Sequence, residues 1–169
     1  MTLRRALPSD ASSIAALSIE VWLGTYLKQG VSGFFADYAL SEFTPARIAA
    51  LIGDPDEWIV VSQNVEGIDG VIRVTSGRAA PVAGCSETEI STFYVQPRHH
   101  GKGIGKALLN AALARCRERG APSVWLATNA ENTPAIGFYL ARGFRQVGHT
   151  HFRLRDQAYL NNVYCYDLT

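Results

Sequence analysis

The stretch VQPRHHGKGIGK, residues 95–106, decides the fold, because it joins a strand-like segment to a helix-like one through three closely spaced glycines. The preceding residues 88–95 (TEISTFYV) are rich in β-branched and aromatic side chains, which favours a strand. From Ile104 to Arg119 the apolar residues recur at helical spacing. Glycine has no Cβ, so the backbone N–H groups of such a loop can approach a ligand closely, and the helix start that follows favours phosphate. The stretch therefore predicts a pyrophosphate cradle between a strand and a helix.

Two common phosphate-binding loops do not match this spacing. A P-loop has the pattern G-x-x-x-x-G-K-[S/T], but the interval from Gly101 to Gly105 is one residue too short, and Ala107 stands where a hydroxyl would hold Mg²⁺. A dinucleotide-binding loop has the pattern G-x-G-x-x-G, and the interval after Gly103 does not fit it. The glycine spacing therefore excludes both of these loops.

Hydrophobic periodicity along the rest of the chain predicts a mixed α/β architecture. Helices are expected near residues 11–27, 45–51, 104–119 and 132–142, and glycines at 30 and 33 are expected to break the first of them. Strands are expected near residues 2–6, 58–62, 70–75, 88–95, 123–128, 145–153 and 162–168. This order predicts a mixed, largely antiparallel central sheet of about seven strands with helices on both faces. The absence of repeats and linkers favours a single domain over residues 1–169.

Composition narrows the class of protein. The net charge of +1 does not favour nucleic-acid binding. No apolar run is long enough to span a bilayer, and the N-terminal residues do not resemble a signal peptide. The three cysteines form no C-x-x-C pair, and His99 and His100 lack partners at metal-ligand spacing, so we expect no metal. These features predict a soluble, cytoplasmic protein.

Two sequence blocks together resemble the GNAT superfamily of acyl-CoA-dependent N-acyltransferases. Arg98-x-x-Gly101-x-Gly103 is similar to the Arg/Gln-x-x-Gly-x-Gly/Ala loop of that family. NTPAIGFYLARGF, residues 132–144, is similar to its N-x-x-A-x-x-F-Y-x-x-x-G-F signature. The order of the expected elements agrees over nearly the whole chain. The resemblance implies the GNAT fold, with the central sheet splayed at the acyl-CoA site.

The same resemblance implies acetyl-CoA as co-substrate and a primary amine as acceptor. It places the pantetheine and thioester contacts at the end of the strand, on Phe93, Tyr94 and Val95, with Asn132 reaching the pantetheine arm. Asn132 also suits the N-cap of its helix. The pyrophosphate contacts fall on the loop and helix start, chiefly through backbone N–H groups, at Arg98, His99, His100, Gly101, Lys102, Gly103, Ile104, Gly105 and Lys106.

Acetyl transfer to an amine needs a base for the ammonium proton, a donor for the oxygen that gains charge and an acid for the leaving thiolate. Glu89 is the expected base, directly or through water, because it precedes Val95 by an even number of strand residues and matches the glutamate of family members that use one. The alternative is an ion-paired or solvent-facing strand residue. Tyr139 matches the family's acid tyrosine, and the alternative is a core aromatic. The Val95 N–H is the expected oxyanion donor.

The acceptor is not defined by these motifs. Trp22 and Tyr26 lie in the first helix, which walls the acceptor pocket in the family, and are candidate substrate contacts. A small-molecule amine is favoured. A protein N-terminus or lysine as acceptor, and a non-catalytic acyl-CoA-binding module, remain open alternatives. The resemblance also admits a homodimer in which late strands such as 162–168 pair between two copies.

Overall fold

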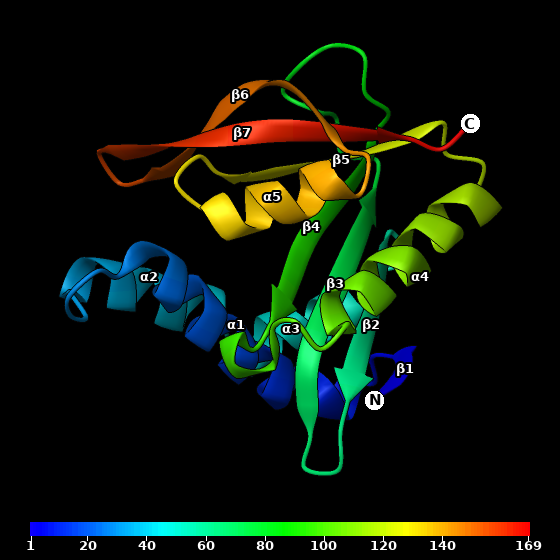
Figure 1. The fold of residues 1–169 in the computed structure, drawn as a ribbon. Helices are drawn as coiled ribbons and strands as arrows, with labels where there is room; N and C mark the ends of the chain where they lie inside the picture. Colours follow the sequence, from blue (N-terminus) through cyan, green and yellow to red (C-terminus); the bar gives the residue numbers. More distant parts are fainter. The chain divides into compact units, whose positions relative to one another are not determined.

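The computed structural model describes residues 1–169. Its strands are β1 (Thr2–Arg5), β2 (Glu57–Gln63), β3 (Ile68–Ser76), β4 (Thr88–Val95), β5 (Ser123–Asn129), β6 (Arg145–Leu154) and β7 (Gln157–Asp167). Its α-helices are α1 (Ala11–Tyr26), α2 (Gly33–Glu42), α3 (Pro45–Ile52), α4 (Ile104–Glu118) and α5 (Thr133–Ala141), and two 3₁₀ turns cover Pro8–Asp10 and Pro97–His99 (Figure 1).

The strands form one seven-stranded sheet in the order β1-β2-β3-β4-β5-β7-β6. Strands β4 and β5 run parallel, whereas β1 with β2, β5 with β7, and β6 with β7 run antiparallel. The prediction of a mixed sheet of about seven strands is therefore confirmed.

Helix α2 was not expected from the sequence. Glycines at 30 and 33 were expected to break the first helix, and α1 does end before them at Tyr26, but Gly33 is also the first residue of α2. Ser32 caps this helix, since its hydroxyl accepts a hydrogen bond from the Phe35 N–H at 3.4 Å. Glycine weakens a helix interior, but at the first position it interrupts no intrahelical bond. The break was therefore predicted correctly, but the helix start that follows it was missed.

The chain divides into two compact units, Met1–Val74 with Thr92–Ala112, and Thr75–Ser91 with Leu113–Thr169. In the first unit, α1 and α3 pack together and bury one face of β2 and β3 (Figure 1). The core of this unit consists of Ala11, Ile14, Ala15, Leu17, Ile48, Ile59, Val61 and Val71. The apolar side chains of α1 recur at helical spacing, which is why one stripe of the helix is buried.

The start of α4 packs against the opposite face of β3, at Gly70. A Cβ at this position would lie 2.9 Å from Leu108 Cδ1 and 3.0 Å from Ile104 Cγ2, so a larger residue would push the helix away. Side chains alternate between the two faces of a strand, so Val71 meets α1 and α3 while Gly70 meets α4. In this unit, helices therefore cover both faces of the sheet, as the sequence predicted.

A buried polar row crosses the first unit. The Arg73 guanidinium on β3 forms an ion pair with Glu57 Oε1 on β2 at 3.0 Å and donates a hydrogen bond to Thr92 Oγ1 on β4 at 3.1 Å. The Glu57 side chain is only 5% exposed. Since a buried charge is costly unless it is paired, this row holds the three strands in one register.

The second unit is built on the β5–β7–β6 ladder, in which Trp125 lies opposite Cys165 and Cys165 lies opposite Arg145. Helix α5 contributes Tyr139, whose ring packs with Phe144 and Tyr164 at centroid distances of 5.6 and 6.2 Å. These rings and the antiparallel ladder form the apolar interior of this unit.

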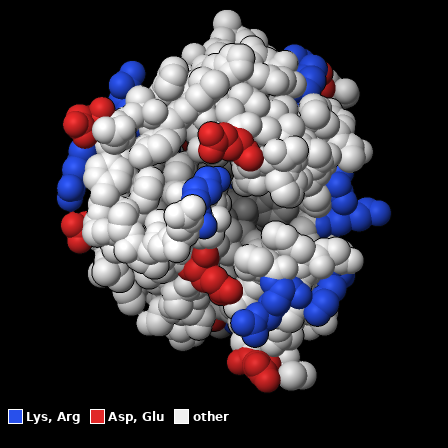
Figure 2. Space-filling model, turned by 60° about the vertical axis from the view of Figure 1, so that its left-hand side comes forward, with Lys and Arg blue, Asp and Glu red and all other residues white.

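Charged side chains of both signs are interspersed on the face drawn in Figure 2, where most of the surface is uncharged. This agrees with the near balance of 16 basic and 15 acidic residues. No helix is long and apolar enough to cross a membrane.

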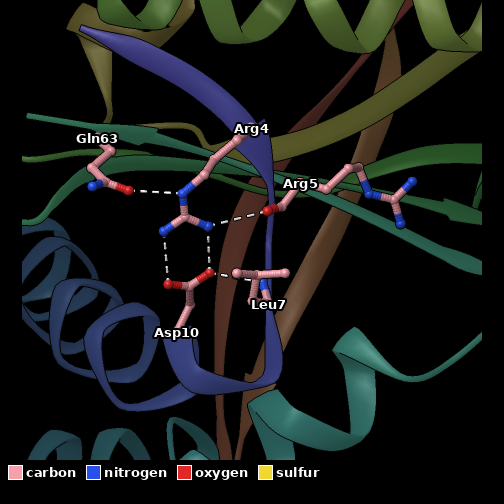
Figure 3. A network of polar contacts seen from close by, with 5 residues as sticks. All are labelled: Arg4, Arg5, Leu7, Asp10 and Gln63. Carbon is pink, nitrogen blue, oxygen red and sulfur yellow. Dashed lines mark hydrogen bonds and ion pairs between the residues drawn. The ribbon is translucent and has the colours of Figure 1, made fainter.

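A polar network closes the N-terminal end of the first unit (Figure 3). Arg4 on β1 forms a two-pronged ion pair with the Asp10 carboxylate at 2.7 and 2.9 Å, and its Nε donates to Gln63 Oε1 on β2 at 2.7 Å. The Leu7 N–H also donates to Asp10 at 2.7 Å. Asp10 directly precedes α1, but its carboxylate makes no cap hydrogen bond because these donors occupy it. The hydrogen bond from Arg4 lowers the pKa of Asp10, and burial raises it. The hydrogen bond has the larger effect, so the pKa of Asp10 lies below its ordinary value.

We expect Asp10→Asn to lower the free energy of unfolding at pH 7 by about 2 kcal/mol, because it leaves the Arg4 guanidinium without its carboxylate. The folded-state pKa of Asp10 is depressed, so the ion pair stabilises the protein above the unfolded pKa of about 3.9 and is lost as the pH falls through the folded value. Urea unfolding at pH 7 and pH 3 measures both effects, and the gap between wild type and variant should narrow at pH 3.

The matched control is Asp56→Asn, at an exposed position before β2. It should change the free energy of unfolding by less than about 0.5 kcal/mol. Equal losses in the two variants, or a loss in Asp10→Asn that does not change between pH 7 and pH 3, would contradict this account of the ion pair.

Candidate active site

The glycine loop has the geometry of an anion-binding turn. Gly101 and Gly103 adopt φ angles of 78° and 85°, a left-handed conformation that glycine alone adopts at little cost. Helix α4 begins directly afterwards at Ile104, and the Ala107 N–H makes its first intrahelical bond to the Gly103 carbonyl at 3.0 Å. The N–H groups of the first turn have no partner inside the helix, so they are available to an anion. The left-handed turn and the helix start that the predicted cradle requires are thus present in the backbone.

The side chains around this loop add positive charge. Arg98, Lys102 and Lys106 are all exposed on the loop and the first turn of α4. Lys102 Nζ donates to His99 Nδ1 at 3.3 Å, which holds the ammonium group over the loop. Charged donors beside backbone N–H groups suit a ligand with several phosphate charges.

His100 ties the loop back to the end of β4. Its Nε2 donates a hydrogen bond to the Val95 carbonyl at 3.0 Å. The next peptide is held as well, because the Gln96 N–H donates to the Asp69 carbonyl of β3 at 2.9 Å. Both sides of the Val95–Gln96 peptide are therefore fixed, and this is the point at which the thioester contacts were expected. No sequence pattern indicates this role for His100.

The predicted strand-end residues Phe93, Tyr94 and Val95 are half-buried on β4, next to the loop and in the same compact unit. Burial raises the pKa of the Tyr94 phenol well above its ordinary value. Gln96 follows this strand end, and its side-chain amide donates to Glu20 Oε2 on α1 at 3.0 Å. A carboxylate of α1 thus lies beside the end of β4, a contact that sequence spacing could not predict.

Trp22 and Tyr26, the predicted substrate contacts, lie in the same unit as the loop. Trp22 is buried and Tyr26 is half-buried, and their ring centroids are 4.6 Å apart. Their spacing of four residues places both rings on one side of α1. The Trp22 ring also contacts rings of α2 and of the segment after α2. Helix α2 was not predicted from the sequence.

Glu89 belongs to the second unit, where it lies on β4 opposite Trp125 of β5. Its side chain is 14% exposed and forms an ion pair with Arg78 Nη1 at 3.6 Å. The Arg78 carbonyl in turn accepts a hydrogen bond from Trp125 Nε1 at 3.0 Å. Glu89 is therefore neither a freely exposed carboxylate nor one enclosed by apolar groups. Arg78 was missed because it lies in a loop that sequence spacing does not connect to β4.

Tyr139 also belongs to the second unit and is only 7% exposed. Its ring packs on Phe144 and Tyr164, so the alternative of a core aromatic describes its ring correctly. A buried tyrosine still carries a hydroxyl that can donate a proton, so packing of the ring is compatible with an acid role.

Asn132 is the N-cap residue of α5, and its Oδ1 accepts a hydrogen bond from the Ala135 N–H at 3.4 Å. The capping expected of this residue is confirmed. The amide nitrogen of a side chain that caps through its oxygen remains a donor, so capping does not conflict with ligand binding.

The cysteines do not have the properties of a nucleophile. Burial, together with interaction with Cys165, raises the pKa of Cys85 to about 11, and burial raises the pKa of Cys116 to about 11. The thiolate is the reactive form, so both thiols are protonated near neutral pH. A reaction in which the amine attacks the thioester directly needs no acyl-cysteine intermediate, and protonated thiols are consistent with such a reaction. No group of three or more His, Cys, Asp or Glu side chains is arranged to hold a metal ion.

The structure thus places the loop, the end of β4 and the rings of α1 in the first unit, and Glu89, Asn132 and Tyr139 in the second unit. Arg78 and Gln96 are additional residues around them, and His100, expected as a pyrophosphate contact, also holds the end of β4. Arg78 and Gln96 are common residue types at unremarkable sequence positions, so no sequence pattern identifies them.

Comparison with known proteins identifies the family of the chain. The sequence profile of the Acetyltransferase (GNAT) family matches residues 27–144. An uncharacterised N-acetyltransferase of Mycobacterium bovis is 29% identical over 146 residues, which cover 86% of this chain and 90% of that protein. The streptothricin acetyltransferase of Streptomyces lavendulae is 32% identical over 157 residues, covering 86% of this chain and 82% of that one.

Among solved structures, the PaiA N-acetyltransferase of Thermoplasma acidophilum in complex with coenzyme A superimposes with a TM-score of 0.78, covering 98% of each chain at 16% identity. At this identity the likeness is evidence for the fold, which is that of the GNAT proteins. The family match spans well over half of the chain and includes both sequence blocks. The chain therefore belongs to the acetyltransferase (GNAT) family, and it is an enzyme of the N-acetyltransferase class.

Proposed function

We propose that this enzyme transfers the acetyl group of acetyl-CoA directly to a primary amine of a small molecule in the cytoplasm. The observation that carries the proposal is the left-handed Gly101–Gly103 turn at the start of α4, next to the end of β4. The coenzyme A complex of the PaiA structure and the streptothricin acetyltransferase, at 32% identity, support the donor and the kind of acceptor. The family match includes residues of both compact units, so we infer one N-acetyltransferase domain over residues 1–169.

The residues present fit the donor. Coenzyme A carries several phosphate charges, and the loop offers backbone N–H groups with Arg98, Lys102 and Lys106 around them. Bound acetyl-CoA supplies the acetyl group as a thioester. In this proposal the backbone from Arg98 to Lys106 holds the pyrophosphate, and Phe93, Tyr94, Val95 and Asn132 hold the pantetheine arm.

Three groups of the chain carry the chemistry. Glu89 accepts the proton of the incoming amine, directly or through a water molecule, and Arg78 holds its carboxylate in place through the ion pair at 3.6 Å. The Val95 N–H donates to the thioester oxygen as it gains negative charge. His100 holds the next peptide, Val95–Gln96, through the Val95 carbonyl and so keeps the end of β4 in place. Tyr139 donates a proton to the leaving thiolate, and a phenol of pKa about 10 is suited to that task.

A thiol-release assay tests the function. Purified protein, acetyl-CoA and a panel of primary amines that includes streptothricin should release free coenzyme A, detected with a thiol reagent, only when both substrates are present. Binding of acetyl-CoA is measured in parallel by calorimetry. Binding of acetyl-CoA without coenzyme A release from any amine would mean that the chain is an acyl-CoA-binding module.

The loop assignment predicts that Gly103→Ala raises the KM for acetyl-CoA. A non-glycine residue at φ 85° costs about 1–2 kcal/mol, and relaxation of this strain displaces the donor groups. We expect KM to rise roughly tenfold, as steady-state kinetics would measure. The control is Gly120→Ala, at φ 73° after α4, which carries the same strain outside the loop. If both variants change KM equally, the loop has no special role.

The acid assignment predicts that Tyr139→Phe lowers kcat by about 100-fold, because the ring and its packing remain while the proton donor is lost. Acetyl-CoA binding should persist. Tyr164→Phe is the matched control, since Tyr164 is a buried ring of the same cluster whose hydroxyl accepts from Asn162 Nδ2 at 3.2 Å. We expect that variant to keep near-wild-type kcat. An unchanged kcat in Tyr139→Phe would show that Tyr139 is a packing residue only.

The base assignment predicts that Glu89→Gln lowers kcat/KM for the amine about 100-fold at pH 7. The loss should shrink at higher pH, where more of the amine is already deprotonated in solution. Glu87→Gln, at an exposed position just before β4, is expected to behave like the wild type. A pH–rate profile of Glu89→Gln parallel to that of the wild type would argue against general-base catalysis by this residue.

A further inference from the structure

Seven aromatic rings of the first unit are connected by ring contacts, and six of them form a cluster that includes Trp22 and extends to Tyr94. Trp22 is at its centre, with ring centroids 4.6 Å from Tyr26, 4.8 Å from Tyr38 and 5.8 Å from Phe35. These distances lie in the range in which aromatic side chains attract one another. We call the following residues the aromatic cluster: Trp22, Tyr26, Phe35, Tyr38, Phe43 and Tyr94.

The aromatic cluster is not the core of this unit. The buried core comprises aliphatic residues of α1, α3, β2 and β3, and of the six rings only Tyr94 packs against it. Trp22 is buried, but the other five rings are half-buried. Helix α2, which carries Phe35 and Tyr38, buries a single residue, Ala39. So many partly exposed rings at one place are typical of a binding surface for an apolar ligand.

The cluster is continuous with the end of the donor strand. Phe43, which follows α2, lies 6.3 Å from the Trp22 ring and 6.4 Å from the Tyr94 ring, measured between centroids. Tyr94 directly precedes Val95, the residue whose N–H we assign to the thioester oxygen. A ligand resting on the rings therefore has one end beside the place where the acetyl group is transferred.

The polar groups of the cluster suit an amine. Burial, with smaller effects of Glu42 and Tyr26, raises the pKa of Tyr38 to about 12, so its hydroxyl stays neutral and can donate or accept a hydrogen bond. Glu20, held by Gln96 at 3.0 Å, places a carboxylate next to the end of β4. Rings and a carboxylate together favour a ligand that joins a planar apolar group to a cationic nitrogen.

We propose that the acceptor is an arylalkylamine, whose aromatic group lies on the aromatic cluster while its primary amine points toward the end of β4. Phe35 and Tyr38 then determine specificity, because these two rings of α2 contact Trp22 and belong to neither the aliphatic core nor the donor strand. This inference rests on the proposed acetyl transfer and adds the substrate class to it.

The test compares kcat/KM for three amines with acetyl-CoA: phenethylamine, 2-cyclohexylethylamine of similar size, and ethanolamine. We expect phenethylamine to exceed ethanolamine by at least about tenfold and 2-cyclohexylethylamine by roughly two- to tenfold, because only the phenyl ring combines apolar area with the electrostatics of a π-system. Streptothricin serves as a reference acceptor.

Phe35→Leu and Tyr38→Leu keep apolar volume but remove a ring. Each should reduce the preference for phenethylamine over 2-cyclohexylethylamine to near unity without changing the KM for acetyl-CoA. Leu40→Ala is the control, because Leu40 lies on the same helix, is 65% exposed and is not part of the cluster. Thermal unfolding of each variant establishes that it is folded before its kinetics are compared.

The outcomes separate the two proposals. The inference is overturned if coenzyme A release with streptothricin or ethanolamine is equal to or faster than with phenethylamine. It is also overturned if the preference for phenethylamine over 2-cyclohexylethylamine survives Phe35→Leu. Either result leaves the acetyltransferase function intact. If no amine is acetylated, the proposed function fails, and calorimetric titration with phenethylamine decides the inference. Saturable binding that Phe35→Leu abolishes supports the cluster as an amine-binding surface, whereas an absence of binding overturns it.

Discussion

The close approach of α4 to β3 at Gly70 is the constraint on which the donor site depends. Leu108 and Ile104 occupy the space that any side chain at position 70 would need, and the Tyr94 carbonyl lies 3.4 Å from the same point. Only without a side chain there can the first turn of α4 stand beside the end of β4. The glycine loop then connects two fixed ends, which is why its N–H groups converge on one place.

Polar contacts keep those ends in position. The Arg73–Glu57 pair joins β3 to β2, and its hydrogen bond to Thr92 extends the connection to β4, at whose end we propose the thioester contacts. At the end of that strand, the backbone of Asp69 and the ring of His100 hold the peptide after Val95 from two sides. Groups that must stabilise charge during a reaction are most effective when they are oriented beforehand. These contacts supply that orientation from the scaffold rather than from the ligand.

The sequence predicted the strongly periodic elements well. Helices α1, α3, α4 and α5 and all seven strands were expected close to their observed positions. The one missed element, α2, begins with glycine and exposes most of its surface, so it lacks the buried stripe on which periodicity depends. Asp10 shows a related limit of prediction from the sequence. A side chain that can cap a helix was instead paired with Arg4, because a charged partner on β1 outcompetes the backbone N–H groups.

What the sequence determined by itself is the local chemistry of the donor site: glycines where the chain must turn left-handed, a helix start for phosphate, and the block that contains Asn132 and Tyr139. These depend on residues close together in the chain, and their spacing carries the information. Only the tertiary structure decided the partner of Glu89, the clamp on Val95 and the ring cluster that extends from Trp22 to Tyr94. Each of these joins segments distant in sequence, and common residue types such as arginine, histidine and phenylalanine gain their roles from the neighbours that folding gives them.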